Sequence, residues 1–338
     1  MRRRRFASGA LAALAAALAI PAAAHGAFAP PDTHGPPLGV PKDKLAAALD
    51  CSGGFANASR APVLLVPGTT LNPEVEFSWN WERALSRLDW PYCTVALPDD
   101  GMNDVQIAGE YVVYAIRRMY ARSDRRVDVI GHSQGGMVPR WALRFWPATR
   151  QMVNDLVGLS PSNHGTVDAI PACAAGCAPS FWQQRTGSNF LSALNSYQET
   201  FPGVSYSSIY TRTDEVVVPN LGPGASSSLH GGGGKIANVA IQDVCPLDAS
   251  EHLAVGTYDN PAYELAIDAL THRGPADASR VGAAACTRAF MPGVDRSTFL
   301  HDYWRELAYI GKVVSSYPTV PREPPLACYT TASCGPAN

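Results

Sequence analysis

A serine flanked by glycines is the feature of this sequence with the clearest chemical meaning. Gly131 to Gly135 read Gly-His-Ser-Gln-Gly, so Ser133 stands at the centre of a G-x-S-x-G pattern. An apolar run at 127–130 precedes the pattern and a helix-like run at 136–143 follows it, which predicts a strand, a sharp turn and a helix. In such a turn the hydroxyl projects above the sheet edge, where a base can activate it as a nucleophile.

We expect the base and its orienting acid to follow the serine in the sequence. In a doubly wound sheet that carries a serine turn, the expected order is Ser, then Asp or Glu, then His. Asp214 closely follows an expected strand at 207–210, and His252 follows one at 236–244 through a short loop. Loops at the carboxyl ends of parallel strands are where catalytic groups gather. We therefore predict Ser133 as nucleophile, Asp214 as orienting acid and His252 as base.

Other acids and histidines after the serine have simpler interpretations. Asp243 and Asp248 flank Cys245, and a loop stabilised by a disulfide explains them. His301 lies on an expected helix, where a packed or surface role is the simpler reading. His230 opens a run of four glycines that resembles an esterase oxyanion motif, but that motif belongs before the serine. We interpret the run as a glycine turn.

The elements that must position these residues alternate between strand and helix. Buried strands are expected at 62–66, 127–130, 156–159, 207–210 and 236–244. A helix is expected to begin after Asn103 or Asp104, with Ile107, Tyr111, Tyr114 and Met119 on its inward face. This alternation predicts the α/β class, with a mostly parallel central sheet and helices on both faces.

The domain organisation is expected to be simple. No clean linker and no internal repeat divides the chain, so we expect one α/β domain over 25–338 with a C-terminal extension over 287–338. Within that extension, residues 298–313 have the spacing of an amphipathic helix. The spacing leaves open whether this helix covers a substrate pocket as a lid or packs on the core.

Composition and the N-terminus favour an exported protein. Four arginines at 2–5, an apolar run at 11–20 and small residues at 22–24 predict a signal peptide over 1–24, cleaved near Ala24. The Sec and twin-arginine routes both remain open. Loss of the four arginines takes the formal net charge from −2 to −6, which does not favour nucleic acid or anionic lipid as a partner. No later run is long and apolar enough to span a bilayer. A secreted monomer is expected.

The cysteine content agrees with export. Eight cysteines and an even count fit full pairing in an oxidising compartment, although spacing alone leaves the connectivity open. None of the spacings resembles a zinc site, and we expect no metal and no organic cofactor.

Several separated motifs, in order, resemble the Candida antarctica lipase B family of α/β-hydrolases. The likeness runs from about Cys51 to about Cys286. The motifs are Leu-Leu-Val-Pro-Gly-Thr at 64–69, Gly-His-Ser-Gln-Gly-Gly at 131–136, Trp-Gln-Gln-Arg-Thr-Gly-Ser at 182–188 and Tyr-Thr-Arg-Thr-Asp-Glu-Val-Val at 210–217. The resemblance implies the same three catalytic residues. It also implies an oxyanion hole formed by the backbone of Thr69 and Gln134, with the Thr69 hydroxyl as a further donor.

The resemblance also implies pocket residues and disulfide pairs. His132, Ser162, Thr166 and Val216 fall at substrate-pocket positions, but the yeast enzyme has Trp at the first and Asp at the second, so its stereopreference and chain-length preference do not carry over. The implied disulfides are Cys51–Cys93, Cys245–Cys286 and Cys328–Cys334, which leaves Cys173 and Cys177 as an additional local pair.

Together these expectations describe a secreted serine hydrolase of the lipase type. It would cleave acylglycerols or other apolar esters through an acyl-enzyme, and an oil–water interface is one place where it would meet them. A carboxylesterase or polyester hydrolase with the same three residues is the alternative within enzymes. A catalytically silent binding protein of the same fold is the alternative from another class, although such proteins usually lack one of the three residues.

Overall fold

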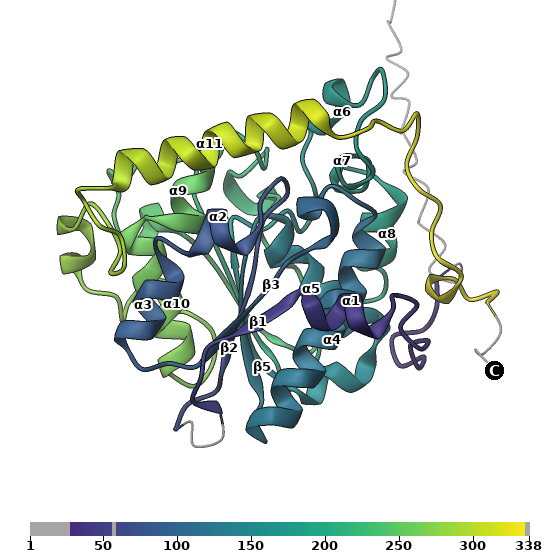
Figure 1. The fold of residues 1–338 in the computed structure, drawn as a ribbon, viewed down its shortest axis with the longest axis horizontal. Coiled ribbons are helices and arrows are strands. Elements are labelled where there is room, and N and C mark those ends of the chain that lie inside the picture. The colour runs from purple at the N-terminus through teal and green to yellow at the C-terminus, as the bar shows by residue number, and fades with distance from the viewer. Residues whose placement is uncertain (1–27, 56–58, 335–338) are drawn as a thin grey trace, which may run out of the picture.

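The structure, a computed structural model, describes residues 28–55 and 59–334. The predicted signal peptide over 1–24 lies outside them. At the centre is a sheet in the order β1-β3-β2-β4-β5-β6-β7, in which every neighbouring pair is parallel except the antiparallel β1 and β3 (Figure 1). The predicted α/β class is confirmed. The strands are β1 (Leu49–Cys51), β2 (Val63–Val66), β3 (Tyr92–Val95), β4 (Val127–His132), β5 (Val153–Leu159), β6 (Ser205–Tyr210) and β7 (Lys235–Ala240).

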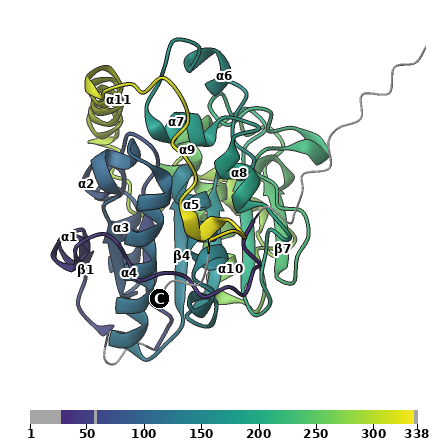
Figure 2. The same cartoon turned by 90° about the vertical axis from the view of Figure 1, so that its right-hand side faces the viewer.

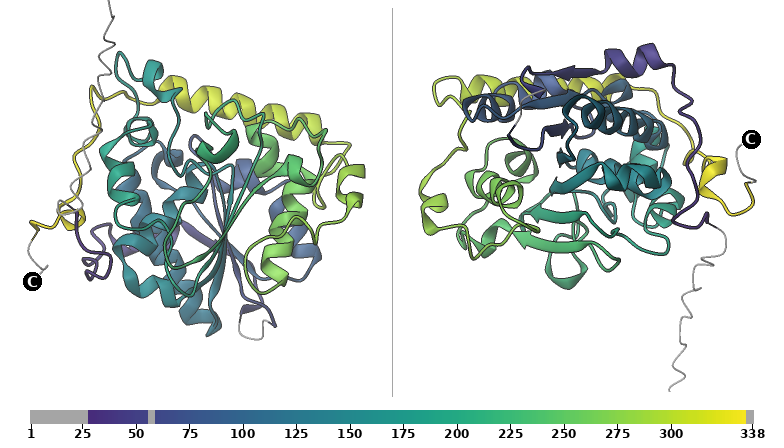
Figure 3. Two further views of the ribbon diagram at one scale, coloured as in Figure 1. Left: turned by 180° about the vertical axis from the view of Figure 1, so that it is seen from behind. Right: turned by 90° about the horizontal axis from the view of Figure 1, so that it is seen from below.

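Helices flank the sheet on both faces, and the strands fan out between them with the usual twist (Figure 3). The α-helices are α1 (Lys42–Ala47), α2 (Pro73–Phe77), α3 (Trp81–Arg87), α4 (Val105–Ser123), α5 (Gln134–Phe145), α6 (Ala169–Ala172), α7 (Pro179–Gln184), α8 (Asn189–Leu194), α9 (His252–Thr257), α10 (Asn260–Thr271) and α11 (Phe299–Ser316).

Two apolar cores, one on each face of the sheet, hold the molecule together. Alternate residues of a strand point to opposite faces, and β2 shows this directly. Leu64 and Val66 pack with α4, α5 and α8, whereas Val63 and Leu65 pack with α3 and α10. A strand buried on both faces reads as a continuous apolar run, which is why β2, β4 and β5 are recognisable in the sequence.

Two details of the expected elements are wrong. The strand expected at 236–244 ends at Ala240, because the Asp243 side chain accepts a hydrogen bond from the Ala240 N–H (3.1 Å) and Ile241–Asp243 forms a 3-10 helix. In α4, Met119 is buried, but Ile107 is exposed and Tyr111 and Tyr114 are only partly buried. The buried stripe of α4 instead runs through Val105, Ala108, Val112, Ile116 and Met119.

The C-terminal helix α11 crosses one end of the molecule, at the top of Figure 1. Its inward side carries the acidic residues Asp302 and Glu306, both buried. The apolar side chains of Leu300 and Trp304 are 66% and 65% exposed. The apolar stripe that marks this helix in the sequence therefore does not pack into either main core.

Four disulfides tie loops to the sheet and to one another. Cys51–Cys93 joins the paired strands β1 and β3, and Cys245–Cys286 links the segment after β7 to the segment before α11. Cys173–Cys177 and Cys328–Cys334 close short local loops. These pairs are those that the resemblance implies, together with the additional local pair.

None of the helices described here is long and apolar enough to cross a membrane.

Candidate active site

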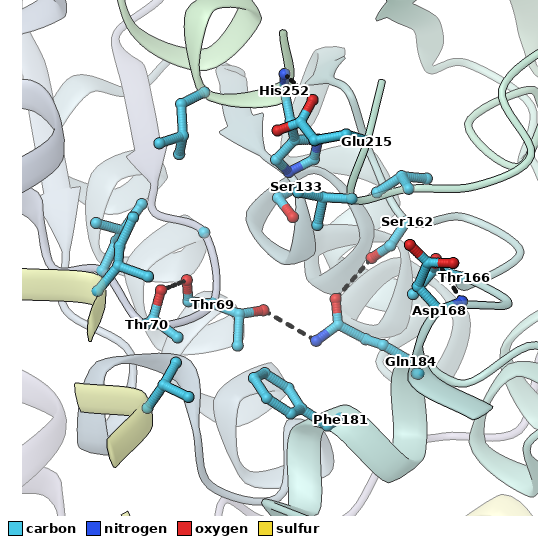
Figure 4. Close-up of a pocket in the computed structure, with 18 of the residues that line it drawn as sticks. Thr69, Thr70, Ser133, Ser162, Thr166, Asp168, Phe181, Gln184, Glu215 and His252 are labelled. Atoms are coloured by element: carbon cyan, nitrogen blue, oxygen red, sulfur yellow. Dashed lines mark hydrogen bonds between the residues drawn. The ribbon is translucent and has the colours of Figure 1, made fainter. Parts of the chain in front are cut away.

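A cavity of about 470 Å³ opens at the carboxyl ends of the parallel strands. Residues that follow β2, β4, β5, β6 and β7 all contribute to its lining, so side chains far apart in the sequence meet there (Figure 4). This is the edge at which open α/β sheets bind ligands. Ser133 and His252 both line the cavity, and Figure 4 shows Ser133 beside the imidazole ring of His252.

Ser133 occupies the strained turn between β4 and α5. Its backbone lies at φ 54° and ψ −120°, in a region that L-residues rarely adopt. The turn depends on two close backbone approaches. A Cβ at position 131 would lie 1.9 Å from the Gly135 carbonyl oxygen, and a Cβ at position 135 would lie 2.1 Å from the Val66 carbonyl oxygen. Only glycine fits at either place, so the G-x-S-x-G pattern follows from the geometry of the turn.

His252 begins α9 and is held from two sides. Its Nδ1 faces both carboxylate oxygens of Asp214, at 2.9 and 3.0 Å, and its backbone N–H donates to Glu215 (3.1 Å). Asp214 is held in turn by the backbone N–H groups of Val216 and Val217, at 3.0 and 2.8 Å. With Nδ1 donating to the carboxylate, the other ring nitrogen, Nε2, is free to accept a proton.

The charges of this pair stabilise each other. Burial by itself would lower the pKa of His252, but the charge and hydrogen bond of Asp214, with Glu215 and Glu251 nearby, raise it above its ordinary value of 6.5. Burial likewise would raise the pKa of Asp214, but His252 and the two backbone donors hold it below its ordinary value of 3.8. The pair therefore stabilises the imidazolium form that His252 adopts when it accepts a proton.

Thr69, which follows β2, and Gln134, which directly follows Ser133, are in side-chain contact beside the serine turn. Gln134 is the first residue of α5, so its backbone N–H has no acceptor within the helix. The Thr69 hydroxyl accepts hydrogen bonds from the side-chain amides of Gln134 (3.0 Å) and Gln184 (2.9 Å). A hydroxyl has two acceptor sites and one donor. Because both acceptor sites are occupied, its proton is left to donate to another group at the cavity.

The four pocket residues expected from the resemblance all line the cavity. Ser162 donates to the Gln184 side-chain oxygen (2.8 Å), and Gln184 in turn contacts Thr69 (Figure 4). Thr166 accepts from the Val218 N–H (3.2 Å), which anchors the loop that carries Val216. His132 lines the cavity but is only 1% exposed, because both of its ring nitrogens face other protein groups.

The rest of the lining is mostly apolar. One wall comes from α11, through Leu307, Ile310 and Val314, and the facing wall comes from α6 and α7. Figure 2 shows α11 and α6 on opposite sides of the same end of the molecule. The cavity-facing residues of α6 and α7 are Ala169, Ala172 and Phe181. An apolar group bound here would be enclosed on two sides by hydrocarbon side chains.

Several site residues cannot be found from the sequence patterns. Gln184 lies within one of the motifs that resemble the lipase B family, and no other sequence pattern marks it as a site residue. Glu76 sits on the short helix α2, where no pattern marks it, yet its carboxylate contacts His132 (2.5 Å) and the Gly68 N–H (2.8 Å). Glu215 directly follows the predicted acid, and its contact with the His252 backbone depends on the loop conformation.

The acids and histidines for which the sequence analysis preferred a non-catalytic role do not line the cavity. Asp243, Asp248, His230 and His301 are not among the residues that line the cavity. Within residues 28–55 and 59–334, no three His, Cys, Asp or Glu side chains gather closely enough to hold a metal ion.

This chain is similar to lipases in both sequence and structure. A family model described as a PGAP1-like alpha/beta domain matches residues 101–217. Lipase B of Pseudozyma antarctica is 37% identical over 225 residues, which cover 66% of this chain and 65% of that protein, slightly less than two thirds of its length. The crystal structure of Aspergillus fumigatus lipase B superposes with a TM-score of 0.80 at 32% identity, covering 91% of this chain and 75% of that one.

Proposed function

Since the chain belongs to the lipase B family of α/β-hydrolases, we propose that it is a serine ester hydrolase that cleaves acylglycerols or similar apolar esters. The observation that carries the proposal is that Ser133 and His252 line the same apolar cavity, while Asp214 contacts Nδ1 of His252 at 2.9 Å. A binding protein of this fold would not need the three residues in this arrangement. All of them come from one chain, so we propose a monomeric enzyme.

The proposed reaction proceeds through an acyl-enzyme. Ser133 attacks the ester carbonyl carbon while Nε2 of His252 takes the hydroxyl proton, and Asp214 stabilises the imidazolium that forms. The negative charge that develops on the carbonyl oxygen is bound by the backbone N–H of Gln134 and by Thr69. The imidazolium returns the proton to the leaving alcohol as the tetrahedral intermediate collapses. Water, or another alcohol, then releases the acyl group by the same steps, and the chemistry requires no metal or organic cofactor.

The cavity and its surroundings support an apolar, aggregated substrate. A volume of about 470 Å³ accommodates an acyl chain. Apolar side chains are also exposed on α11, at Leu300, Trp304 and Val314, and elsewhere at Ile170 on α6 and at Val216. Such exposed apolar residues favour contact with a lipid phase. We propose His132, Ser162, Thr166 and Val216 as residues of the substrate pocket.

A chain-length profile, run on dissolved and on emulsified esters, tests the substrate class. We expect hydrolysis of long-chain triglyceride emulsions at a rate equal to or above that of soluble short-chain esters, because the apolar walls bind the longer chain. The assay compares initial rates below and above the solubility limit of each ester. A preference for soluble short-chain esters, with no gain on the emulsion, would assign the chain to the carboxylesterases. Cleavage of polyester film alone would favour a polyester hydrolase.

Thr69→Val tests the oxyanion hole. Valine has nearly the shape of threonine but removes the hydroxyl, so we expect kcat to fall about 10²–10³-fold with KM little changed. The change also leaves the Gln134 and Gln184 amides without their shared acceptor, at a cost of about 1–3 kcal/mol in stability. Thr69→Ser keeps the hydroxyl and is the matched control. Equal kcat values for Thr69→Val and Thr69→Ser would exclude the hydroxyl from the oxyanion hole.

The pH dependence of kcat/KM tests the proposal that His252 is the base. His252 must be neutral to accept the serine proton, so kcat/KM falls as the pH drops through the pKa of the free enzyme. Asp214, Glu215 and Glu251 raise that pKa, so the midpoint of the acidic limb is expected above 6.5. Initial rates between pH 5 and 9, at substrate concentrations well below KM, measure it. A midpoint clearly below 6.5 would contradict this account of the base.

We also propose that the protein is exported. The predicted signal at 1–24 and the four disulfides support an oxidising destination. N-terminal sequencing of the secreted chain would test cleavage near Ala24.

A further inference from the structure

A second histidine–carboxylate pair lies directly behind the proposed catalytic residues. His132 ends β4, immediately before Ser133, and is only 1% exposed. Each of its ring nitrogens faces an oxygen. Nδ1 lies 2.5 Å from a carboxylate oxygen of Glu76, and Nε2 donates to the backbone carbonyl of His252 at 3.2 Å. The ring is therefore bonded at both ends, and one end holds the backbone of the proposed base.

Glu76 extends this connection to the oxyanion side. It is fully buried on α2, and its second carboxylate oxygen accepts a hydrogen bond from the Gly68 N–H (2.8 Å). Gly68 immediately precedes Thr69. One chain of hydrogen bonds thus runs from the loop of the proposed oxyanion hole, through Glu76 and His132, to the backbone of His252.

The protonation of this pair follows from its partners. A backbone carbonyl only accepts, so Nε2 of His132 must carry a hydrogen. The 2.5 Å contact between Nδ1 and the Glu76 carboxylate is a hydrogen bond, so a hydrogen lies between these two atoms as well. Both ring nitrogens and both carboxylate oxygens of this buried pair therefore have hydrogen-bond partners.

Packing supports the same connection. The rings of His132 and His252 lie 4.8 Å apart between centroids. Four residues further along the same helix, α9 approaches the His132 ring so closely that a Cβ at position 256 would lie 2.4 Å from it. Gly256 therefore lets the helix that begins with His252 rest against His132. Loss or rotation of the His132 ring would free both the backbone of the base and the helix behind it.

We infer that Glu76 and His132 are positioning residues, which hold the backbone of His252 and the oxyanion loop at Gly68 in a fixed relation to Ser133. The inference rests on the proposed ester hydrolysis. His132 acts through its bond to the His252 carbonyl rather than as a base, and Glu76 acts through His132 and Gly68.

The test compares His132→Phe, Glu76→Ala and Glu76→Gln in the full-length mature protein. Phe retains a ring of similar size but cannot bond, and Ala removes both carboxylate bonds, so we expect kcat to fall about 10–100-fold with KM changed less than about threefold. Glu76→Gln should recover most of the activity. Its amide oxygen can accept from Gly68, and its amide N–H can donate to Nδ1, which keeps the hydrogen on Nε2.

A spectroscopic readout separates positioning from stability. We expect two downfield imidazole protons in the wild-type NMR spectrum, one from the Asp214–His252 pair and one from the Glu76–His132 pair. His132→Phe should remove the second and also shift the first, because the His252 backbone moves. The double variant His132→Phe with Glu76→Ala should lose no more activity than either single variant, as expected for residues that act as a unit.

The matched control is His164→Phe. His164 and Glu199 also form an imidazole–carboxylate pair (3.1 Å), but neither residue lines the cavity. We expect wild-type kcat for this variant. An equal loss in His164→Phe, or wild-type kcat and an unshifted His252 proton in folded His132→Phe, would overturn the positioning role. Should His132→Phe not fold, wild-type kcat in folded Glu76→Ala would overturn it instead. Failure of the wild-type protein to hydrolyse any ester would overturn the proposed function, whatever the NMR spectrum shows.

Discussion

Ser133→Ala is expected to lower ester hydrolysis about 10⁴–10⁶-fold while leaving the fold intact. The hydroxyl is the only group at the turn that can form the acyl-enzyme, so no neighbouring side chain can replace it. Stability should not suffer, because the Ser133 side chain makes no capping bond to α5 and alanine meets the same backbone constraint. Hydrolysis of a p-nitrophenyl ester and labelling by a fluorophosphonate measure the loss, and thermal unfolding checks the fold.

Ser160→Ala is the matched control for this substitution. Ser160 directly follows the neighbouring strand β5, has a positive φ of 44° and is buried with no hydrogen-bond partner for its hydroxyl. It shares a positive φ with Ser133 but does not line the cavity. We expect Ser160→Ala to hydrolyse esters and to react with the fluorophosphonate at the wild-type rate. Near-full activity in Ser133→Ala would exclude the proposed mechanism.

Asp214→Asn is expected to lower kcat about 10⁴-fold without unfolding the protein. The amide oxygen should take the place of the carboxylate oxygen that accepts from Val216 and Val217. The amide nitrogen then faces Nδ1 of His252, where the second carboxylate oxygen lies at 3.0 Å. An N–H donated to Nδ1 moves the ring hydrogen to Nε2, so the nitrogen that should accept the serine proton is already protonated.

The same substitution has a second, independent consequence. It removes the charge that raises the pKa of His252, while burial, which lowers that pKa, remains. The acidic limb of kcat/KM should therefore shift to lower pH. Asp243→Asn is the control, because Asp243 also follows a strand downstream of the serine but lies outside the cavity. Wild-type kcat in Asp214→Asn, or an equal loss in Asp243→Asn, would remove Asp214 from the proposed role.

Much of the fold can be predicted because buried parallel strands leave short apolar runs. The runs at 62–66 and 127–130 correspond to β2 and β4 almost residue for residue. The pattern does not indicate β1 or β3. β1 has only three residues and is largely unburied, and β3 reads Tyr-Cys-Thr-Val, with polar and apolar residues mixed. Their place in the sheet depends on pairing with each other and with β2, which no local pattern records.

The choice of Asp214 and His252 was possible because parallel strands bring their carboxyl ends to one edge. Strand position and chain order were therefore sufficient to select them from among several acids and histidines. The inward faces of α4 and α11 were harder to predict. In α4, small and branched side chains pack against the core while Ile107 points to solvent. In α11, part of the apolar stripe lines the cavity and the rest is exposed on the surface, whereas the acidic Glu306 is buried.

Burial of Glu306 illustrates what only three-dimensional packing decides. Desolvation, with Glu76 and Glu251 nearby, raises the pKa of Glu306 well above its ordinary value on the inward side of α11. A glutamate on an amphipathic helix would ordinarily be assigned to the solvent side.

The sequence by itself determined the α/β class, the serine turn and the order of the three proposed catalytic residues, because each leaves a local mark: an apolar run, a pair of obligatory glycines, or a polar residue just past a strand. Only the tertiary structure decided how the Thr69 hydroxyl is oriented, which way α11 faces, and that Glu76 and His132 join the oxyanion loop to the base. Apart from the Glu76–Gly68 bond, the hydrogen bonds of Thr69, Glu76 and His132 at this site link residues 56 to 120 positions apart. Their existence depends on hydrogen-bond geometry and close packing, which short-range sequence patterns do not encode.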